Sequence, residues 1–208
     1  MVVPRISATI LGAFLIHKAT VFTLALIPLL RLFYLAVNNK LTAHPIEYIE
    51  HSTGFWALTI MLVLLCLTPL RLIFKINKQI RLRRMLGLFA FFYAFVHILT
   101  YLWLDYAFSY DEIAKDIIKH PRIWVGFIAF LFLLPLAITS NRASIKRLGA
   151  NWVELHKLVY LVAILSVSHF WMLAKRDIRE PVIFAVVLFF LLAVRVYFKF
   201  SAKLPRSG

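Results

Sequence analysis

Long apolar segments are the feature that most restricts how this chain can fold. Six stretches are each close to, or longer than, the roughly 20 residues that span a bilayer as an α-helix. They cover residues 10–37, 54–73, 85–105, 122–140, 152–174 and 181–199. Charged residues make up 16% of the chain, against about a quarter in a typical soluble domain. Because the connections are short, the sequence predicts an all-α integral membrane protein, a bundle of six transmembrane helices that forms a single domain over residues 1–208.

The charges between these segments predict the orientation of the bundle. The chain carries a net charge of +15, and its basic residues gather in the connections at 71–84 and 142–147 and in the C-terminal tail. Basic connections next to spans mark the cytoplasmic side of a membrane protein. Most acids lie in the other connections, of which the last, 175–180, carries both signs. Both termini are therefore expected to be cytoplasmic, and nucleic acid is not an expected partner.

One cysteine and two prolines within the apolar segments have structural explanations. Cys66 is the only cysteine, so the chain can form neither an internal disulfide nor an iron–sulfur or zinc site built from cysteines. Pro69 and Pro135 interrupt backbone hydrogen bonding near the inner ends of their helices. The hydroxyl side chains that can satisfy the freed backbone groups are Thr68, Thr139 and Ser140.

The histidines say most about function. Three of them are expected in outer loops or at the inner membrane surface: His44, His120 and His17. His51 is expected at the outer mouth of the second span. His97 and His169 lie in the outer halves of the third and fifth spans, and His156 lies in the inner half of the fifth. An ionisable side chain inside a span is costly, so these positions are candidates for a functional site.

His97 and His169 are expected at matching depth on different helices. A hydrogen bond to a neighbouring helix would explain either histidine alone. Two neutral imidazoles that face each other across a bundle, between apolar walls rich in Phe, Leu and Trp, suit the axial positions of a haem iron. Zinc fits less well, because no Asp, Glu or Cys lies at that depth to complete its coordination.

The spacing between the two histidines of the fifth span raises a geometric problem. His156 and His169 are thirteen residues apart, a rise of roughly 20 Å along a helix, which suits two haems stacked across the membrane. The same thirteen steps turn the side chains roughly 140° apart on an ideal helix. We therefore expect either a distorted helix, near Ser166 and Ser168, or haems on different flanks of it.

No second histidine of the third span matches the level of His156. The residue thirteen positions before His97 is Arg84, which follows Arg83. Arginine stays protonated and has no lone pair for iron, so the second ligand of an inner haem stays open. The two arginines can instead contact haem propionates, a flavin phosphate or anionic lipid, or simply mark the cytoplasmic side.

Several motifs in combination resemble one family of bacterial membrane proteins. The motifs are "HPIEYIEHSTG" (44–54), "LTPLR" (67–71), "RRMLGLFAFFYAFVHILTY" (83–101) and "TSNRASIKRLGANWVELHKLVYLVAILSVSHFW" (139–171), with the spacing of Lys18 and Pro28. Together they are similar to the MsrQ (formerly YedZ) family, the haem-binding membrane subunits of the periplasmic methionine-sulfoxide reductase system. That family belongs to the ferric-reductase-like transmembrane superfamily, and the resemblance covers nearly the whole chain.

The resemblance implies a b-type cytochrome of the bacterial inner membrane, with one or two haems. Such proteins pass electrons to a periplasmic molybdopterin enzyme that reduces methionine sulfoxide in oxidised proteins. The electrons are described as coming from the quinone pool or from a cytosolic flavin reductase. The family's haem ligands fall on His97, His156 and His169, and a family motif covers His51. Members are also associated with FMN, although the sequence contains no glycine-rich phosphate loop or Rossmann fingerprint.

These inferences predict an electron-transfer subunit rather than the catalytic subunit of an oxidoreductase. Electrons are expected to enter near residues 71–84 and His156, and to leave from the side of His97 and His169 to a partner on the outer loops. Those loops are 38–53, 105–122 and 175–180. Aromatic residues near that face, typical of a membrane-interface belt, are Trp103, Trp171, Tyr101 and Tyr106.

Two alternatives stay open. Within the same superfamily, the chain could be the transmembrane subunit of a ferric or other metal reductase, whose flavin and nicotinamide domain would be a separate protein. From a different class, it could be a small membrane transporter or assembly factor whose histidines bind protons or metal. A haem b spectrum that changes on dithionite reduction separates the redox functions from this last one.

Overall fold

A computed structural model describes residues 8–75, 78–174 and 177–201. Within these ranges six helical segments are long and apolar enough to cross a membrane, which confirms the predicted all-α membrane fold. The segments are α1 (Ala8–Val37), α2 (Pro45–Phe74), α3 (Arg83–Leu99) with its π-helical extension Thr100–Asp105, α5 (Pro121–Ile138), α7 with α8 (Ala150–His156 and Leu158–Leu173), and α9 (Arg179–Ser201). Three shorter helices connect them: the 3₁₀ turn Lys78–Leu82, α4 (Tyr110–Lys119) and α6 (Arg142–Leu148).

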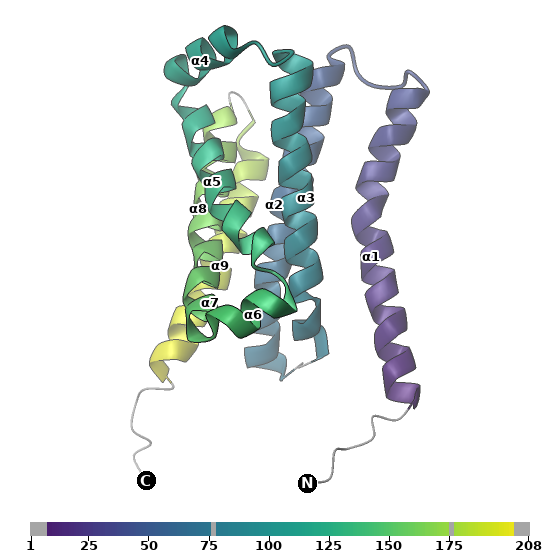
Figure 1. The fold of residues 1–208 in the computed structure, drawn as a ribbon, viewed down its shortest axis with the longest axis vertical. Coiled ribbons are helices and arrows are strands. Elements are labelled where there is room, and N and C mark those ends of the chain that lie inside the picture. Colours follow the sequence, from purple (N-terminus) through teal and green to yellow (C-terminus); the bar gives the residue numbers. More distant parts are fainter. Residues whose placement is uncertain (1–7, 76–77, 175–176, 202–208) are drawn as a thin grey trace.

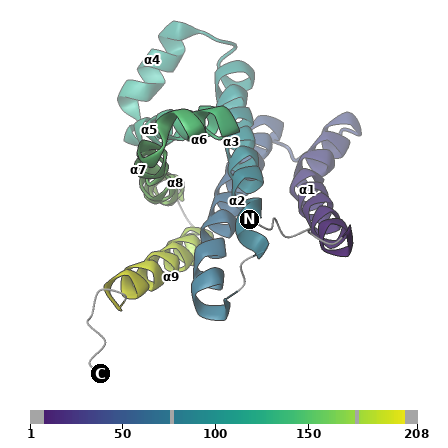
Figure 2. The same cartoon turned by 60° about the horizontal axis from the view of Figure 1, so that its bottom comes forward.

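Two helix pairs form the centre of the bundle. α2 packs along α3, α5 packs along α8, and α9 packs against both α2 and α8. Figure 1 shows α1 to one side of this group, α4 across one end and α6 with α7 at the other. Figure 2 shows α1 and α9 at the periphery. The first described residues of α1 and the last described residues of α9 lie at the same end of the bundle. The cytoplasmic location of that end stays a prediction.

A tyrosine ties the peripheral helix α1 to the centre. Pro28 interrupts α1, since proline has no backbone N–H and clashes with the preceding turn. The hydroxyl of Tyr93, on α3 and almost fully buried, donates to the Ala25 carbonyl at 2.8 Å and accepts from the Leu29 amide at 3.1 Å. One hydroxyl thus bridges the Ala25 carbonyl and the Leu29 amide, which lie on either side of the proline, and fixes α1 against α3.

An arginine satisfies the carbonyl that Pro69 leaves free. Because Pro69 has no N–H, the Leu65 carbonyl of α2 lacks its partner within the helix. Arg195 reaches across from α9 and donates to this carbonyl. The prediction that Thr68 would do so is wrong: its hydroxyl is buried without a hydrogen-bond partner among the described residues. A threonine hydroxyl can reach carbonyls three or four residues earlier in its helix, and the Leu65 carbonyl lies within that range, but Arg195 binds it instead.

Thr139 and Ser140 bond to backbone carbonyls near Pro135, but not to the Leu131 carbonyl that the proline frees. Thr139 Oγ1 donates to the Pro135 carbonyl at 2.7 Å, and Ser140 Oγ donates to the Leu136 carbonyl at 2.6 Å. Cys66 is half-buried and free. His17 lies in α1, but its side chain is outside the described part of the chain, as are residues 175–176 of the mixed-charge loop.

Two predicted elements differ from the structure. α2 begins at Pro45, not at residue 54, because proline is favoured in the first turn of a helix. His51 therefore lies within a helix. The connection 105–122 contains the amphipathic helix α4 rather than an open loop.

The distortion of the fifth span lies at a different residue from the one predicted. The helix breaks at Lys157, directly after His156, where the Lys157 amide donates to the Glu154 carbonyl at 3.0 Å in a tightened turn. Around Ser166 and Ser168 the helix α8 runs without interruption. A tight turn changes the rotation of everything before it, so His156 and His169 need not obey the ideal angular relation.

Candidate metal centre

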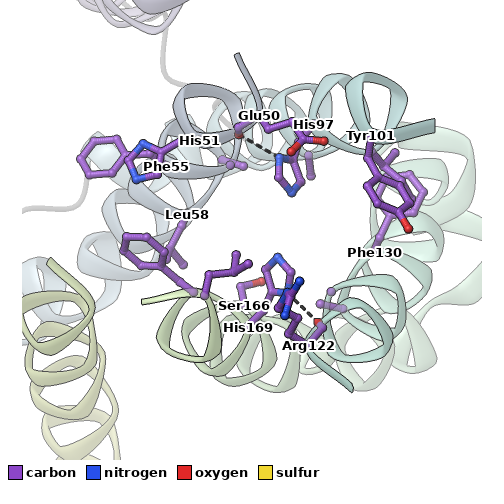
Figure 3. Close-up of a pocket in the computed structure, with 18 of the residues that line it drawn as sticks. Glu50, His51, Phe55, Leu58, His97, Tyr101, Arg122, Phe130, Ser166 and His169 are labelled. Atoms are coloured by element: carbon purple, nitrogen blue, oxygen red, sulfur yellow. Dashed lines mark hydrogen bonds between the residues drawn. The ribbon is translucent and has the colours of Figure 1, made fainter. Parts of the chain in front are cut away.

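The half of the bundle nearer α4, called the outer half from here on after its predicted orientation, contains a cavity of about 630 Å³ between α2, α3, α5 and α8. Its walls are mainly apolar and aromatic. His97 from α3 and His169 from α8 point toward each other across it (Figure 3). Their ring centroids are 6.2 Å apart and their ring planes are inclined by 75°. The structure therefore brings together the two histidines that the sequence places at one depth.

Both imidazoles are held by the same kind of contact. His97 Nδ1 lies 3.0 Å from the Glu50 carbonyl oxygen, and His169 Nδ1 lies 2.7 Å from the Arg122 carbonyl oxygen. Each histidine follows its carbonyl by 47 residues. A carbonyl can only accept, so each Nδ1 carries the proton. Each Nε2 is left with a lone pair. A metal-binding histidine usually donates its other ring N–H to a carbonyl or carboxylate in this way.

The dimensions of the pair fit a haem. Metal–nitrogen bonds of about 2 Å on each side, with each ring centroid about 1 Å behind its nitrogen, require centroids about 6 Å apart, close to the separation seen here. Cofactor pockets have volumes of about 300–1,000 Å³. Among the described residues, no group of three or more His, Cys, Asp or Glu side chains is placed to hold a metal. Two imidazoles alone would suit a metal that brings its remaining ligands with it, as a haem iron does.

A polar cluster covers the outer mouth of the cavity. Tyr101 donates to Asp116 Oδ2 at 2.9 Å, and His120 Nδ1 lies 2.7 Å from Asp116 Oδ1. Burial alone would raise the pKa of Asp116, but hydrogen bonds from Tyr101, Tyr106 and His120 outweigh burial and lower it. Burial and the neighbouring carboxylate raise the pKa of Tyr106 to about 12. Asp116 thus fixes α4 over the cavity.

Several expected surface residues have different places in the structure. His120 is half-buried and bonded to Asp116 rather than free in a solvated loop. Tyr101 and Tyr106 belong to the cover of the cavity, and are more than interfacial anchors. Trp103 and Trp171 are exposed, as expected of belt residues. His44 is also exposed.

His51 is not one of the facing imidazoles. It lies at the edge of the cavity, directed away from the space between the other two (Figure 3). Its side chain is 58% exposed, and its Nε2 lies 3.9 Å from Glu180 Oε2. Its ring contacts Phe55 and Phe170 at centroid distances of 6.3 and 6.1 Å. This arrangement suits a residue of the rim rather than a ligand.

The inner half of the bundle holds a second cavity, of about 960 Å³. Met61 and Leu133 line both cavities, so the two are stacked along the membrane direction. His156 lines the inner one, and its neighbours include six cations: Arg81, Arg83, Arg84, Lys157, Arg195 and Lys199. The residues described along this lining include no acid. The arginines predicted to accompany His156 therefore do share its cavity.

The inner imidazole is held differently from the outer pair. His156 Nε2 lies 3.1 Å from Thr139 Oγ1, whose own proton goes to the Pro135 carbonyl. Nε2 therefore donates to Thr139, and the Trp152 ring stacks on His156 at 3.9 Å between centroids. To bind iron through Nε2, His156 would have to release Thr139.

Sequence reasoning missed two parts of these cavities. Arg195 is a charged residue within the last span, and that signal alone marks it as a candidate. Glu50 contributes its carbonyl to His97, and its carboxyl Oε1 is buried without a hydrogen-bond partner among the described residues. A carbonyl contact leaves no trace in residue type, so that role of Glu50 could not be found from sequence.

Comparisons with known proteins agree with this architecture. A family model described as the ferric reductase like transmembrane component matches residues 53–167. A protein of Herminiimonas arsenicoxydans is 46% identical over 189 residues, covering 89% of this chain and 87% of the relative. One of Xanthomonas campestris pv. campestris (strain 8004) is 49% identical over 166 residues, covering 80% and 76%. Both are described as the protein-methionine-sulfoxide reductase heme-binding subunit MsrQ.

No solved structure matches the chain significantly. The family model covers more than half of the chain, and the two relatives cover most of it at nearly half identity. The six apolar helices agree with a multi-pass protein of a bacterial membrane. The chain therefore belongs to the MsrQ family of ferric-reductase-like transmembrane proteins.

Proposed function

We propose that this chain is a b-type cytochrome of the inner membrane, which carries electrons to a periplasmic methionine-sulfoxide reductase. The observation that carries the proposal is the facing pair His97 and His169, with each Nδ1 bound to a carbonyl and the centroids 6.2 Å apart. The names of the relatives, which state haem binding, support it. A haem iron held there supplies one-electron chemistry between its ferric and ferrous states.

The residues around the pair have separate tasks in this proposal. His97 and His169 would hold a haem iron through their Nε2 lone pairs. The carbonyls of Glu50 and Arg122 fix the tautomer and the direction of each ring. Apolar side chains such as Phe130 keep water from the site, and a dry surrounding controls the potential of a metal centre.

For the inner cavity we propose an anionic cofactor, either a second haem on His156 or FMN. Its cations and the absence of acid among its described residues support an anionic occupant. Arg83 and Arg84 suit propionate carboxylates or a flavin phosphate, because guanidinium groups bind such anions through paired hydrogen bonds. Anionic lipid headgroups have the same chemistry and compete for the exposed edge of the inner cavity.

We further propose that the end of the bundle with α6 faces the cytoplasm and the end with α4 faces the periplasm. The basic connections at 71–84 and 142–147 support this orientation. The donor is then the quinone pool or a cytosolic flavin reductase, and the acceptor is a periplasmic molybdopterin-containing reductase. The chain itself acts as the electron-transfer subunit, not the catalytic one.

A reoxidation experiment distinguishes this function from metal reduction. The purified chain is reduced anaerobically in nanodiscs and mixed with the periplasmic reductase and methionine sulfoxide, or with a ferric chelate alone. With the reductase in catalytic amount, we expect complete reoxidation to require both the reductase and the sulfoxide. Rapid reoxidation by the ferric chelate alone, with none by the sulfoxide mixture, would favour the ferric reductase. A preparation without any redox-active chromophore would favour a transporter or an assembly factor.

A further inference from the structure

Two glycines lie directly against the facing imidazoles. Gly54 of α2 follows Glu50 by one helical turn, and Gly126 of α5 follows Arg122 in the same way. Each carbonyl that holds a histidine is thus succeeded, on the same helix, by a residue without a side chain. The helix pairs α2–α3 and α5–α8 thus each contain the same set of carbonyl, glycine and histidine.

A side chain at either glycine would meet the ring that it faces. A Cβ at position 54 would lie 3.1 Å from His97 Cε1 and 3.2 Å from its Nδ1. A Cβ at position 126 would lie 2.9 Å from His169 Cε1, 3.0 Å from its Nδ1 and 3.3 Å from its Nε2. These approaches are closer than the carbon contacts of about 3.5–4.0 Å that packed atoms prefer.

We infer that Gly54 and Gly126 are positioning residues, which set the separation and orientation of His97 and His169 at the metal. This inference rests on the proposed function only for its consequence at the haem. The packing of each ring against its glycine is a property of the chain itself.

The imidazoles have little freedom to yield to a methyl group. Each ring is held through Nδ1 by a carbonyl of the same helix that carries the glycine. A ring that moves away from α2 or α5 stretches that hydrogen bond and moves its Nε2 toward the opposite imidazole. Position 126 is the tighter of the two and also touches Nε2, so it is expected to be the more sensitive.

The test compares three glycine-to-alanine variants of the full chain in nanodiscs. Gly126→Ala and Gly54→Ala change the two candidates. Gly87→Ala is the control, because it lies on α3 and its Cβ would meet only Leu64 Cδ2, at 3.9 Å. Each protein is titrated with hemin, and the low-spin ferric EPR signal, which depends on the arrangement of the axial imidazoles, is recorded.

We expect haem affinity at the outer site to fall about tenfold or more for Gly126→Ala, in the range of other second-contact changes. Gly54→Ala should show a smaller loss, and both should shift the EPR signal. Gly87→Ala should leave the outer signal unchanged. Signals and affinities for Gly126→Ala and Gly54→Ala that match the control would overturn the inference.

A second measurement needs no haem, so it tests the positioning role of the glycines separately from the proposed haem function. The melting temperature of the haem-free chain is compared with and without Gly126→Ala, in the natural chain and in a His169→Ala chain. A clash with the ring predicts a loss of stability only where His169 is present. An equal effect in both backgrounds would contradict the positioning role. If the natural chain binds no haem, the proposed function fails while this comparison still decides the inference.

Should Gly126→Ala not fold at all, the answer comes from two other proteins. The double variant with His169→Ala is expected to recover folding, because the ring that clashes is gone. Gly54→Ala provides the EPR measurement at the less crowded position. A double variant that also fails to fold would count against the inference.

Discussion

The outer and inner cavities both contain histidines, but these form hydrogen bonds through different ring nitrogens. In the outer cavity, two imidazoles bind backbone carbonyls through Nδ1 and direct Nε2 to each other. In the inner cavity, the Nε2 of His156 is hydrogen-bonded to Thr139, and the His156 ring stacks on Trp152. The outer site is matched from both halves of the bundle. The inner site combines a single histidine with a group of cations.

This difference shows that the surroundings of a histidine decide what it can bind. A carbonyl acceptor fixes the tautomer that leaves Nε2 free, whereas a hydroxyl at Nε2 competes with a metal. The outer pair therefore has two Nε2 atoms available to a metal, as the proposed function requires. The cations of the inner cavity suit a negatively charged ligand. The predictions below test this contrast.

Loss of an outer imidazole should have the largest effect. His97→Ala and His169→Ala should each abolish one and the same haem signal in the reduced-minus-oxidised spectrum, because one imidazole alone cannot complete the site. His156→Ala should leave that signal intact and disturb only an inner one. If all three variants removed one common signal, and haem never exceeded one per chain, the model of separate sites would be wrong.

Removal of the Arg195 guanidinium should lower the stability of the fold without changing the outer site. Arg195→Leu leaves the buried Leu65 carbonyl without its donor, at a cost of about 1–3 kcal/mol. Thermal unfolding in detergent measures it. In a Pro69→Ala background, the restored N–H can serve this carbonyl, so the same substitution should cost less. Equal costs in the two backgrounds would show that Arg195 acts through another contact.

Release of His156 from its hydroxyl partner should have a moderate effect confined to the inner cavity. Thr139→Val removes the acceptor of Nε2 but keeps the backbone carbonyl that Trp152 binds. A hydrogen bond of about 1 kcal/mol corresponds to roughly a fivefold gain in inner haem affinity. Hemin titration in a His97→Ala chain isolates that site. Weaker inner binding would mean that Thr139 supports a bound ligand rather than competing with it.

The cover of the outer cavity should give the smallest effect, a dependence of stability on pH. The pKa of Asp116 is lower in the folded chain than its ordinary value of 3.8, so its contribution is present above about pH 4 and is lost as the pH falls further. Burial and the neighbouring carboxylate raise the pKa of Tyr106 to about 12, so its contribution is fully present below about pH 10 and is lost as the pH rises through about 12. Asp116→Asn should flatten both limbs of the melting-temperature profile. An unchanged profile would exclude the cluster as the cause.

The parts of this structure that could be predicted are those that residue type records. Span length and charge predict the six helices, and depth along the helices predicts that His97 and His169 meet. The break at Lys157 was not predictable, because one tightened turn in a helix needs no glycine or proline. The carbonyl partners of the two histidines were also hidden, since every residue has a carbonyl. Gly54 and Gly126 gain their meaning only from the rings beside them.

The most direct test of the central claim is the reduced-minus-oxidised absorption spectrum of the purified chain, supplied with haem during expression. The facing pair predicts a b-type spectrum that appears on dithionite reduction, with a low-spin ferric EPR signal before it. The matched preparation of His97→Ala should lack that signal while eluting as the same folded species. A folded, colourless protein, even after haem supplementation, would contradict the account.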